Sequence, residues 1–465
     1  MDMQRTYIGD LKAKVGSEVK IAGWVDVRRD HGKLIFIDLR DASGKVQMVA
    51  LPNHADAHKA ANTIRPEWVI EVTGKVNERP AKMVNKDEPN GAIEIEILSL
   101  NVLNEAQTPP MDVTGDGMEI GEEVRLKYRY LDLRRPRLQK NLNLRHRFIK
   151  ELRDYLDKEG FLEIETPLLS ATTPEGARDF VVPSRLEKGK FYALPQSPQQ
   201  YKQLFMIAGI EKYFQIARCF RDEDTRGDRQ PEFTQFDLEM AFVQRDDVIA
   251  FIEKALIHLV QTVTPEKKIQ EVPFPRLSYK EAMEKYGSDK PDLRTDKNDK
   301  NLLAFCWVLD FPFFEKTGEG GWTFTHNPFS SPKLEHMEWL LKGEKIGEIL
   351  TTQYDMALNG YEIGGGSIRN NKSDAIKAVF SVMGYKDESI EKNFGHMLEA
   401  YRYGAPPHGG IAWGLDRILA ILANEPNIRE VIAFAKTGEG RDLMMNAPSE
   451  LEAKRLKELG IKLGK

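Results

Sequence analysis

The pattern of apolar residues changes near residue 105, and this change constrains the fold more than any other feature of the sequence. Up to that point, stretches such as KIAGWVDV (20–27) and GAIEIEIL (91–98) alternate apolar and polar residues, as half-buried β-strands do. Farther along, residues 143–161 place an apolar side chain at every fourth position, which predicts an amphipathic helix ending near Gly160. These side chains are Leu144, Phe148, Leu152 and Leu156. Because 465 residues are too many for one compact core, we expect two or three domains.

Three consecutive stretches follow from this change of pattern. Residues 1–105 contain five strand-like segments, which suit a small barrel of the oligonucleotide-binding (OB) type, although a β-sandwich without a ligand fits the pattern equally well. Residues 106–135 begin rich in Pro, Gly and acidic residues, which predicts a linker. Residues 136–465 mix helices and strands without regular βαβ alternation, which predicts an α+β domain with a mostly antiparallel sheet flanked by helices.

The stretch FRDEDTRGDRQPEFTQFDLEM (220–240) carries ten charged side chains in 21 positions, interleaved with apolar ones. A strand, a charged loop and a returning strand predict an antiparallel hairpin. It would present Arg221 and Glu223 from one strand and Asp237 and Glu239 from the other. Arginine offers bidentate donors for phosphate oxygens, and carboxylates can hold Mg²⁺ or an amino group. For this stretch alone, a solvated hairpin without a ligand remains the alternative.

Two further stretches favour a binding site. YEIGGGSIRN (361–370) places Glu362 and Arg369 around three glycines, which allow either close approach or positive φ; the spacing is not that of a P-loop or a dinucleotide fingerprint. HGGIAWGLDRILAILANEP (408–426) predicts a strand followed by an apolar helix that carries Arg417. For Arg417 by itself, a surface salt bridge is the alternative.

Composition excludes several classes. The net charge of −5 gives no general affinity for nucleic acid, so any such function depends on local placement of charge. No apolar run approaches the roughly 18 residues of a membrane helix, and the first residues lack the pattern of a secretory signal. Cys219 and Cys306 are too few for a disulfide framework or a cysteine-rich zinc site, and we expect both to be buried in a cytoplasmic protein.

Together these stretches resemble the class II aminoacyl-tRNA synthetases. The helix at 143–161 with the following FLEIETPLL is similar to motif 1 of that class, residues 220–240 to motif 2, and GGIAWGLDRILAIL to motif 3. Other stretches are similar to those of aspartyl-tRNA synthetases: TPEGARDF, ALPQSPQQYKQLFM, THNPFSSP, YDMALNGYEIGGGSIRN and YGAPPHGGIAWGLDR. The resemblance spans nearly the whole chain. It implies an OB-fold anticodon-binding domain at 1–105, a linker at 106–135 and a class II catalytic domain at 136–465.

The sequence departs from that family in two places. Bacterial-type members usually carry an insertion domain of about a hundred residues after the stretch corresponding to YKEAMEKYGSDKPDLR, whereas this chain continues directly to LLAFCWVLDF. The missing domain puts in doubt any function that belongs to it. In THNPF, Asn327 stands where many relatives have a second histidine, so only His326 is carried over.

The resemblance implies a two-step reaction. ATP and L-aspartate form aspartyl-adenylate with the help of Mg²⁺, and the aspartyl group is then transferred to tRNA. It assigns catalytic roles to Arg221, Glu362 and Arg417, Mg²⁺ binding to Asp355 and Glu362, and ATP binding to Arg221, Glu223, Phe233, Glu362 and Arg417. It assigns aspartate binding to Glu175, Ser197, Gln199, Lys202, Asp237, His326 and Arg369, with Lys202 and Arg369 on the side-chain carboxylate. It assigns anticodon binding to Arg28, His31, Phe36, Gln47 and Glu94. Without the resemblance, His31 would be a solvated loop residue and the other four would be ordinary strand residues.

The resemblance also implies partners. We expect a homodimer, because motif 1 in this class packs across a two-fold axis. We expect no interaction with a membrane. The expected substrate is tRNA-Asp. It extends to tRNA-Asn because His31 lies where strict family members more often have leucine and relaxed members often have histidine.

The sequence argues against three other functions. Lys202 paired with Arg369 argues against an asparaginyl-tRNA synthetase. Intact Arg221 and Arg417 argue against a tRNA-binding protein without catalysis, and the barrel argues against an amide-forming ligase derived from a synthetase.

Overall fold

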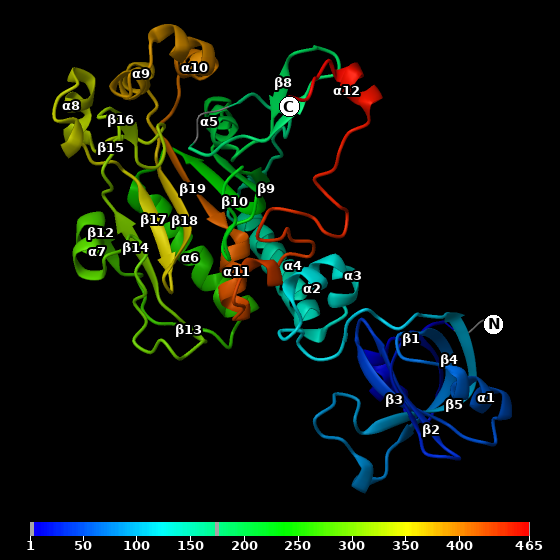
Figure 1. The fold of residues 1–465 in the computed structure, drawn as a ribbon. Helices are drawn as coiled ribbons and strands as arrows, with labels where there is room; N and C mark the ends of the chain where they lie inside the picture. Colours follow the sequence, from blue (N-terminus) through cyan, green and yellow to red (C-terminus); the bar gives the residue numbers. More distant parts are fainter. Residues whose placement is uncertain (1–3, 173–175, 465) are drawn as a thin grey trace. The chain divides into compact units, whose positions relative to one another are not determined.

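The chain folds into two compact units in the computed structural model, which describes residues 4–172 and 176–464. The units are Met1–Thr114 and Gly115–Lys465, and Figure 1 shows them coloured along the sequence. No helix within the described ranges is both long enough and apolar enough to cross a membrane.

The first unit is a closed five-stranded barrel with strand order β1-β2-β3-β5-β4. Its elements are β1 (Glu18–Asp30), β2 (Ile35–Asp41), β3 (Gly44–Ala50), α1 (Ala55–Thr63), β4 (Val69–Glu78) and β5 (Ile93–Asn104). The apolar members of the alternation, such as Ile21, Ile37 and Ile95, are fully buried inside. Closure pairs every strand on both sides and leaves no free edge. The barrel is therefore confirmed, and the β-sandwich alternative is wrong.

The second unit is built around an eight-stranded sheet of order β12-β14-β17-β18-β19-β10-β9-β6. These strands are β6 (Leu162–Glu163), β9 (Lys212–Phe220), β10 (Glu232–Ala241), β12 (Arg276–Ser278), β14 (Phe305–Leu309), β17 (Tyr354–Leu358), β18 (Tyr361–Ile368) and β19 (His408–Gly414). Only the outermost pairs, β12 with β14 and β6 with β9, are parallel. The prediction of an α+β domain with a mostly antiparallel sheet is confirmed.

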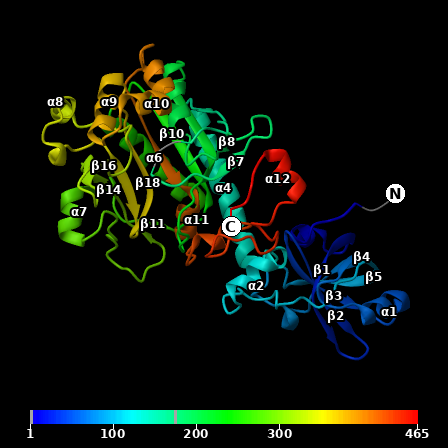
Figure 2. The ribbon, with the colours of Figure 1, turned by 45° about the horizontal axis from the view of Figure 1, so that its top comes forward.

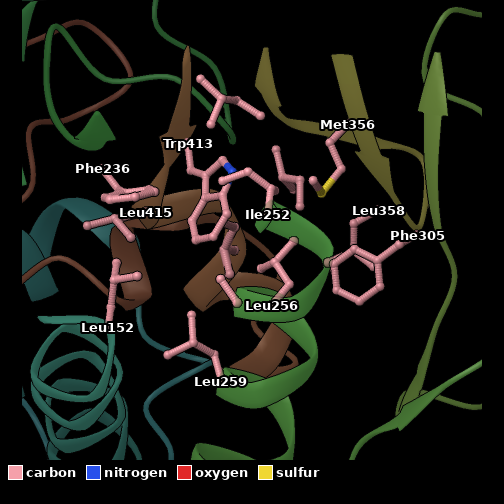
Figure 3. Packing of buried hydrophobic residues seen from close by; sticks show 14 of the residues in the cluster. Leu152, Phe236, Ile252, Leu256, Leu259, Phe305, Met356, Leu358, Trp413 and Leu415 are labelled. Carbon is pink, nitrogen blue, oxygen red and sulfur yellow. The ribbon is translucent and has the colours of Figure 1, made fainter. Parts of the chain in front are cut away.

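Three helices cover the apolar face of this sheet: α4 (Pro136–Lys158), α6 (Arg245–Val263) and α11 (Leu415–Ala423). Figure 3 shows Trp413 and Phe236 of the sheet, whose ring centroids are 4.6 Å apart, packed among leucines of these helices. The side chains predicted to line the inner face of α4 are all buried. The chain leaves α4 through Gly160 at φ +79°, a conformation that glycine adopts without strain.

Smaller elements surround the sheet. The helices are α5 (Gln199–Ile207), α7 (Tyr279–Tyr286), α8 (Met337–Lys342), α9 (Ser373–Val382), α10 (Asp387–Tyr401) and α12 (Ala453–Leu459). The two-stranded sheets pair β7 (Val181–Pro183) with β8 (Phe191–Ala193), β11 (Lys268–Ile269) with β13 (Leu302–Leu303), and β15 (Phe314–Lys316) with β16 (Trp322–Phe324). Figure 2 shows α8, α9 and α10 grouped together, and they pack on one another.

The predicted linker 106–135 is divided by the structure. The boundary between the units lies after Thr114, and residues farther on form α2 (Glu122–Lys127) and α3 (Arg129–Asp132) within the second unit. Three of their charged residues, Arg125, Arg129 and Asp132, are buried, and Asp132 accepts from Arg125 at 3.1 Å and from Arg129 at 2.8 Å. Buried charges persist only when they are paired, so this part of the chain is a packed element and not a flexible connection.

The three glycines of β18 lie in extended backbone, so their role is close approach and not positive φ. A Cβ atom on Gly364 would lie 2.5 Å from the Trp413 ring, and one on Gly366 would lie 2.0 Å from the Gly410 carbonyl oxygen. A Cβ on Gly365 points to the opposite face, 2.5 Å from Asp355 Oδ1. The strand thus needs glycine on both faces.

We expect Gly366→Ala to destabilise the second unit by about 1–3 kcal/mol or more, because backbone on the neighbouring strand has to move. Urea unfolding of the variant measures this change. Gly318→Ala is the matched control, since a Cβ there meets no atom within 4 Å. Equal stability of the two variants would contradict the packing role of Gly366.

Candidate active site and nucleic-acid surface

Segments distant in the sequence converge on one cleft of about 460 Å³ in the second unit. The loop after β9, strands β10, β17 and β18, and the start of α11 all contribute to its walls. The residues predicted for ATP, aspartate or Mg²⁺ that line it are Ser197, Gln199, Lys202, Arg221, Glu223, Phe233, Asp237, His326, Asp355, Glu362, Arg369 and Arg417. Glu175 lies outside the described residues. The structure therefore brings together every other residue predicted for these three ligands.

Strands β9 and β10 form the predicted antiparallel hairpin. Phe236 and Leu238 face the apolar core, whereas Asp237 and Glu239 face the opposite side and are fully buried there. One detail differs from the prediction, because β9 ends at Phe220 and Arg221 and Glu223 therefore lie in the connecting loop. The alternation along β10 explains how one strand serves both the core and a charged cleft.

Arg221 has an unsatisfied donor. Its guanidinium carbon lies 5.1 Å from the centre of the Phe233 ring, a cation–π contact. Its Nε is buried and has no hydrogen-bond partner in the described part of the chain. A buried donor without an acceptor is costly, so this geometry favours an anionic ligand beside Arg221.

Four buried charges form a cluster at the base of the cleft, which we call the charge cluster: Lys202, Asp237, Glu239 and Arg369. Lys202 Nζ lies 2.8 Å from Asp237 Oδ2 and 3.3 Å from Glu239 Oε2. Arg369 donates to both oxygens of Glu239, at 2.9 and 3.1 Å. The resemblance assigned no ligand to Glu239, and sequence reasoning missed that it pairs with both cations. The alternation that buries Asp237 on this face of β10 was the available signal, because Glu239 is two residues farther along.

The two carboxylates of the charge cluster differ. Burial opposes ionisation of Glu239, but Arg369 and Lys202 hold its pKa below the ordinary value. Burial also opposes ionisation of Asp237. Lys202 offsets only part of this effect of burial, so the pKa of Asp237 is raised. Asp237 Oδ1 is also buried without a partner among the residues described, as is Gln199 Nε2. An acceptor and a donor therefore remain available to a ligand at the base of the cleft.

Arg417 reaches the cleft from the first turn of α11. Its side chain donates to the carbonyl oxygens of Asp228, at 3.2 Å, and Glu362, at 2.8 Å. It also forms an ion pair of 3.2 Å with the Asp228 carboxylate. Arg417 therefore does form a salt bridge, as in the alternative interpretation of this residue. Both partners of this salt bridge, however, line the cleft.

Asp355 and Glu362 form an acidic region on the cleft wall. Asp355 accepts from Gln353 at 2.6 Å and lies 3.3 Å from His326 Nε2. Burial, together with the charge of Asp355, raises the pKa of Glu362. A search of the described residues finds no group of three or more His, Cys, Asp or Glu side chains that could hold a metal ion. Two carboxylates fit a cation such as Mg²⁺ that takes its remaining ligands from phosphate and water.

The barrel carries a second set of predicted residues. Phe36 of β2 lies directly opposite Arg29 of β1, so the two share a face. Arg29 makes two bonds to Asp38, at 2.8 and 2.9 Å, and Gln47 donates to Glu94 at 3.3 Å. His31 is exposed in the β1–β2 turn, with its ring centroid 5.5 Å from that of Phe36 in an edge-to-face contact.

Arg28 does not join this set. Its guanidinium points to α1, where it donates to Ala61 O at 2.9 Å and to Asn62 Oδ1 at 2.8 Å. A β-bulge between Val25 and Val27 shifts the register of the residues that follow, so Arg29, and not Arg28, lies opposite Phe36. The anticodon role that the resemblance implies for Arg28 stays a prediction.

A cleft of about 260 Å³ on the barrel adds a residue that sequence reasoning missed. It is lined by Arg29, Gln47 and Arg79, among others. Arg79 Nε is buried there without a hydrogen-bond partner in the described ranges. No motif in the sequence indicated Arg79.

Comparison with known proteins gives a family for each of the two units. The family described as "tRNA synthetases class II (D, K and N)" matches residues 121–438, and the "OB-fold nucleic acid binding domain" family matches residues 19–103. A protein of Dictyoglomus turgidum named "Aspartate--tRNA(Asp/Asn) ligase" is 42% identical over 99% of this chain and 98% of its own length. One of the same name from Rubrobacter xylanophilus is 40% identical over 98% of this chain and 96% of its own length.

This chain belongs to the class II tRNA synthetases, among the aspartate–tRNA ligases. The match to the Dictyoglomus protein extends over 589 aligned positions, so at least 124 of them have no residue in this 465-residue chain. That difference agrees with the absent insertion domain. Residues 287–301 connect α7 with β13 at the expected place.

Solved structures show the same fold at lower identity. The asparaginyl-tRNA synthetase of Pyrococcus horikoshii with asparaginyl-adenylate has a TM-score of 0.76 at 24% identity, covering 93% of this chain and 98% of that one. The aspartyl-tRNA synthetase of Entamoeba histolytica has a TM-score of 0.72 at 21% identity, covering 93% and 91%. Because both amino-acid specificities occur on this fold, specificity has to be argued from the cleft.

His326 provides a test of the cleft electrostatics. Burial alone would lower the pKa of His326, but the charge and hydrogen bond of Asp355, with a contribution from Glu362, raise it above the ordinary value. In Asp355→Asn the burial remains while the main opposing charge is lost, so we expect the pKa of His326 to fall. Histidine titration by NMR measures the shift, with His58 of the barrel as internal reference. An unchanged or higher value would contradict this arrangement.

Proposed function

We propose that this protein is an aspartate–tRNA ligase that activates L-aspartate with ATP and Mg²⁺ and transfers it to tRNA-Asp and tRNA-Asn. The names of its relatives support the reaction. The observation that supports aspartate as the amino acid is the charge cluster. Its two cations, Lys202 and Arg369, already have two carboxylate partners.

Charge balance in the cleft favours aspartate. The cluster is neutral by itself, and in this proposal the α-carboxylate of the amino acid lies at Arg221, so the ammonium group and the side chain have to balance each other at the cluster. In this proposal the ammonium group binds at Asp237 Oδ1 and the side-chain carboxylate binds between Lys202 and Arg369. Asparagine would bring the same ammonium charge but no side-chain carboxylate, which leaves one buried positive charge unbalanced at a cost of several kcal/mol. This argues against the asparaginyl-tRNA synthetase alternative.

The first step follows from the remaining residues. The α-carboxylate of aspartate is ionised at neutral pH, so it attacks the α-phosphorus of ATP without a general base, and pyrophosphate leaves. Arg221 would hold the α-phosphate and the attacking carboxylate, and Arg417 would hold the γ-phosphate. Phe233 offers a stacking surface for adenine, with Glu223 at the ring edge. Asp355 and Glu362 would hold Mg²⁺, which neutralises phosphate charge when bound.

The second step transfers the aspartyl group to the terminal ribose hydroxyl of tRNA, with AMP as the leaving group. Recognition of the anticodon would use the outer face of the barrel, where Phe36 stacks on a base and Gln47 and Glu94 contact base edges. His31 lies beside Phe36, and imidazole can donate to or accept from either type of base edge. That property supports acceptance of both tRNAs, which differ at one anticodon base.

We also propose a homodimer in the cytoplasm. Strand β6 is the edge of the main sheet and belongs to the stretch that resembles motif 1. Leu162 of this strand and Leu169, farther along the same stretch, are 57% and 53% exposed, which leaves apolar side chains open to a second copy. Both cysteines are buried and form no disulfide within the described ranges, in keeping with a reducing compartment.

We expect Arg221→Ala and Arg417→Ala each to reduce aspartate-dependent ATP–pyrophosphate exchange at least a hundredfold, since one lost charge contact to the transition state is worth roughly 3 kcal/mol. Arg402→Ala, which removes an exposed arginine after α10, is the control and should keep normal exchange. Near-normal exchange in either cleft variant would refute its assigned role.

Aminoacylation of the two tRNA transcripts tests relaxed recognition. The wild type should load aspartate onto both, and His31→Leu should lose tRNA-Asn preferentially because leucine cannot hydrogen-bond the differing base. Rejection of tRNA-Asn by the wild type by about a thousandfold, a gap near 4 kcal/mol, would show strict recognition and contradict the proposal.

Light scattering at micromolar concentration should give twice the mass of the chain. Leu162→Asp should shift the mass toward that of one chain, because it places a charge in the proposed contact. A monomeric wild type would rule out the dimer.

A further inference from the structure

The tip of the loop between β9 and β10 is held in place on both sides. Arg226 and Arg229 pair across an antiparallel bridge, so residues 226–229 form a turn. Asp228 and Arg229 of this turn line the cleft, and Asp228 is the residue that pairs with Arg417. The position of this tip therefore affects how Arg417 is presented.

The other side of the tip contacts a turn far along the chain. Ile428 N donates to the Gly227 carbonyl oxygen at 3.0 Å, and Arg429 Nη1 lies 3.4 Å from the Arg226 carbonyl oxygen. The side chain of Asn427 accepts from Arg429 N at 3.0 Å and so orders the turn. Ile428 itself lines the cleft. The turn at 427–429 thus supports both the tip and the cleft wall.

This turn is anchored by the segment after the unit boundary. Arg429 Nε donates to Glu122 of α2 at 2.8 Å, and only 13% of the Arg429 side chain is exposed. Buried Arg129 of α3 donates to the carbonyl oxygens of Arg429 and Ile432, at 2.7 and 2.9 Å. The backbone of the turn is thereby fixed by Arg129, while the direction of the Arg429 side chain depends on Glu122.

We propose that Glu122 and Arg429 are positioning residues for ATP. Their ion pair aims Arg429 at the carbonyl of Arg226, holds the loop tip against the turn, and so keeps Asp228 and Arg417 in place over the nucleotide. Neither residue is among those lining the cleft, so their effect passes through the loop tip. This inference rests on the proposed function and assigns part of its nucleotide binding to α2.

Glu122→Gln tests the inference in the full-length protein. It keeps the size of the side chain but removes the charge that orients Arg429. In steady-state ATP–pyrophosphate exchange, the KM for ATP should rise about fivefold or more, with a much smaller change in the KM for aspartate. Glu122→Asp, which keeps the charge, should recover part of the loss. Glu123→Gln, an exposed neighbour on α2, is the matched control.

The effects of Glu122→Gln and Arg429→Gln should be strongly non-additive, because both remove the same ion pair. An unchanged KM for ATP in Glu122→Gln would overturn the inference. Equal rises in both KM values with a lowered unfolding temperature would also overturn it, because they indicate a general loss of structure. Absence of exchange in the wild type would instead refute the proposed function, so the two failures are distinguishable.

Discussion

The ion pairs that join Lys202, Asp237, Glu239 and Arg369 are the interactions on which the rest of the second unit depends. Each charge is almost completely removed from water, so each is stable only with its partners in place. The partners come from α5, β10 and the end of β18, three elements distant in the sequence. In the proposed binding mode, such a neutral cluster favours a ligand whose ammonium group and side-chain carboxylate balance each other.

The surrounding backbone is shaped to admit these side chains. A Cβ on Gly410 of β19 would lie 2.2 Å from Glu239 Oε2, so glycine is required where the cluster meets the neighbouring strand. Gly365 of β18 likewise leaves room for the side chain of Asp355 on β17. On the opposite face, Gly364 and Gly366 let Trp413 and Tyr354 pack closely. Core packing and the charged cleft are therefore two faces of the same central strands.

Much of this arrangement could be predicted from the sequence, because it follows from local pattern. Alternation predicted the barrel strands, the fourfold spacing predicted α4, and the charged hairpin at 220–240 predicted the cleft. The resemblance to a known family then supplied most cleft residues. Three features could not be predicted, each because it depends on contacts between distant segments. Glu239 pairs with Arg369 across 130 residues, Arg125 of α2 is buried against Glu430 and Asp132, and a β-bulge sets which arginine of β1 lies opposite Phe36.

The most direct test of this account is the preference for aspartate over asparagine in ATP–pyrophosphate exchange, compared between the wild type and Lys202→Met. The wild type should prefer aspartate by at least about a thousandfold in kcat/KM, a difference near 4 kcal/mol. Removing one cation leaves the cluster with a net negative charge, so the preference should fall at least about a hundredfold as asparagine becomes the better balanced ligand. A preference that stays the same in Lys202→Met, with exchange still measurable, would contradict selection by charge balance.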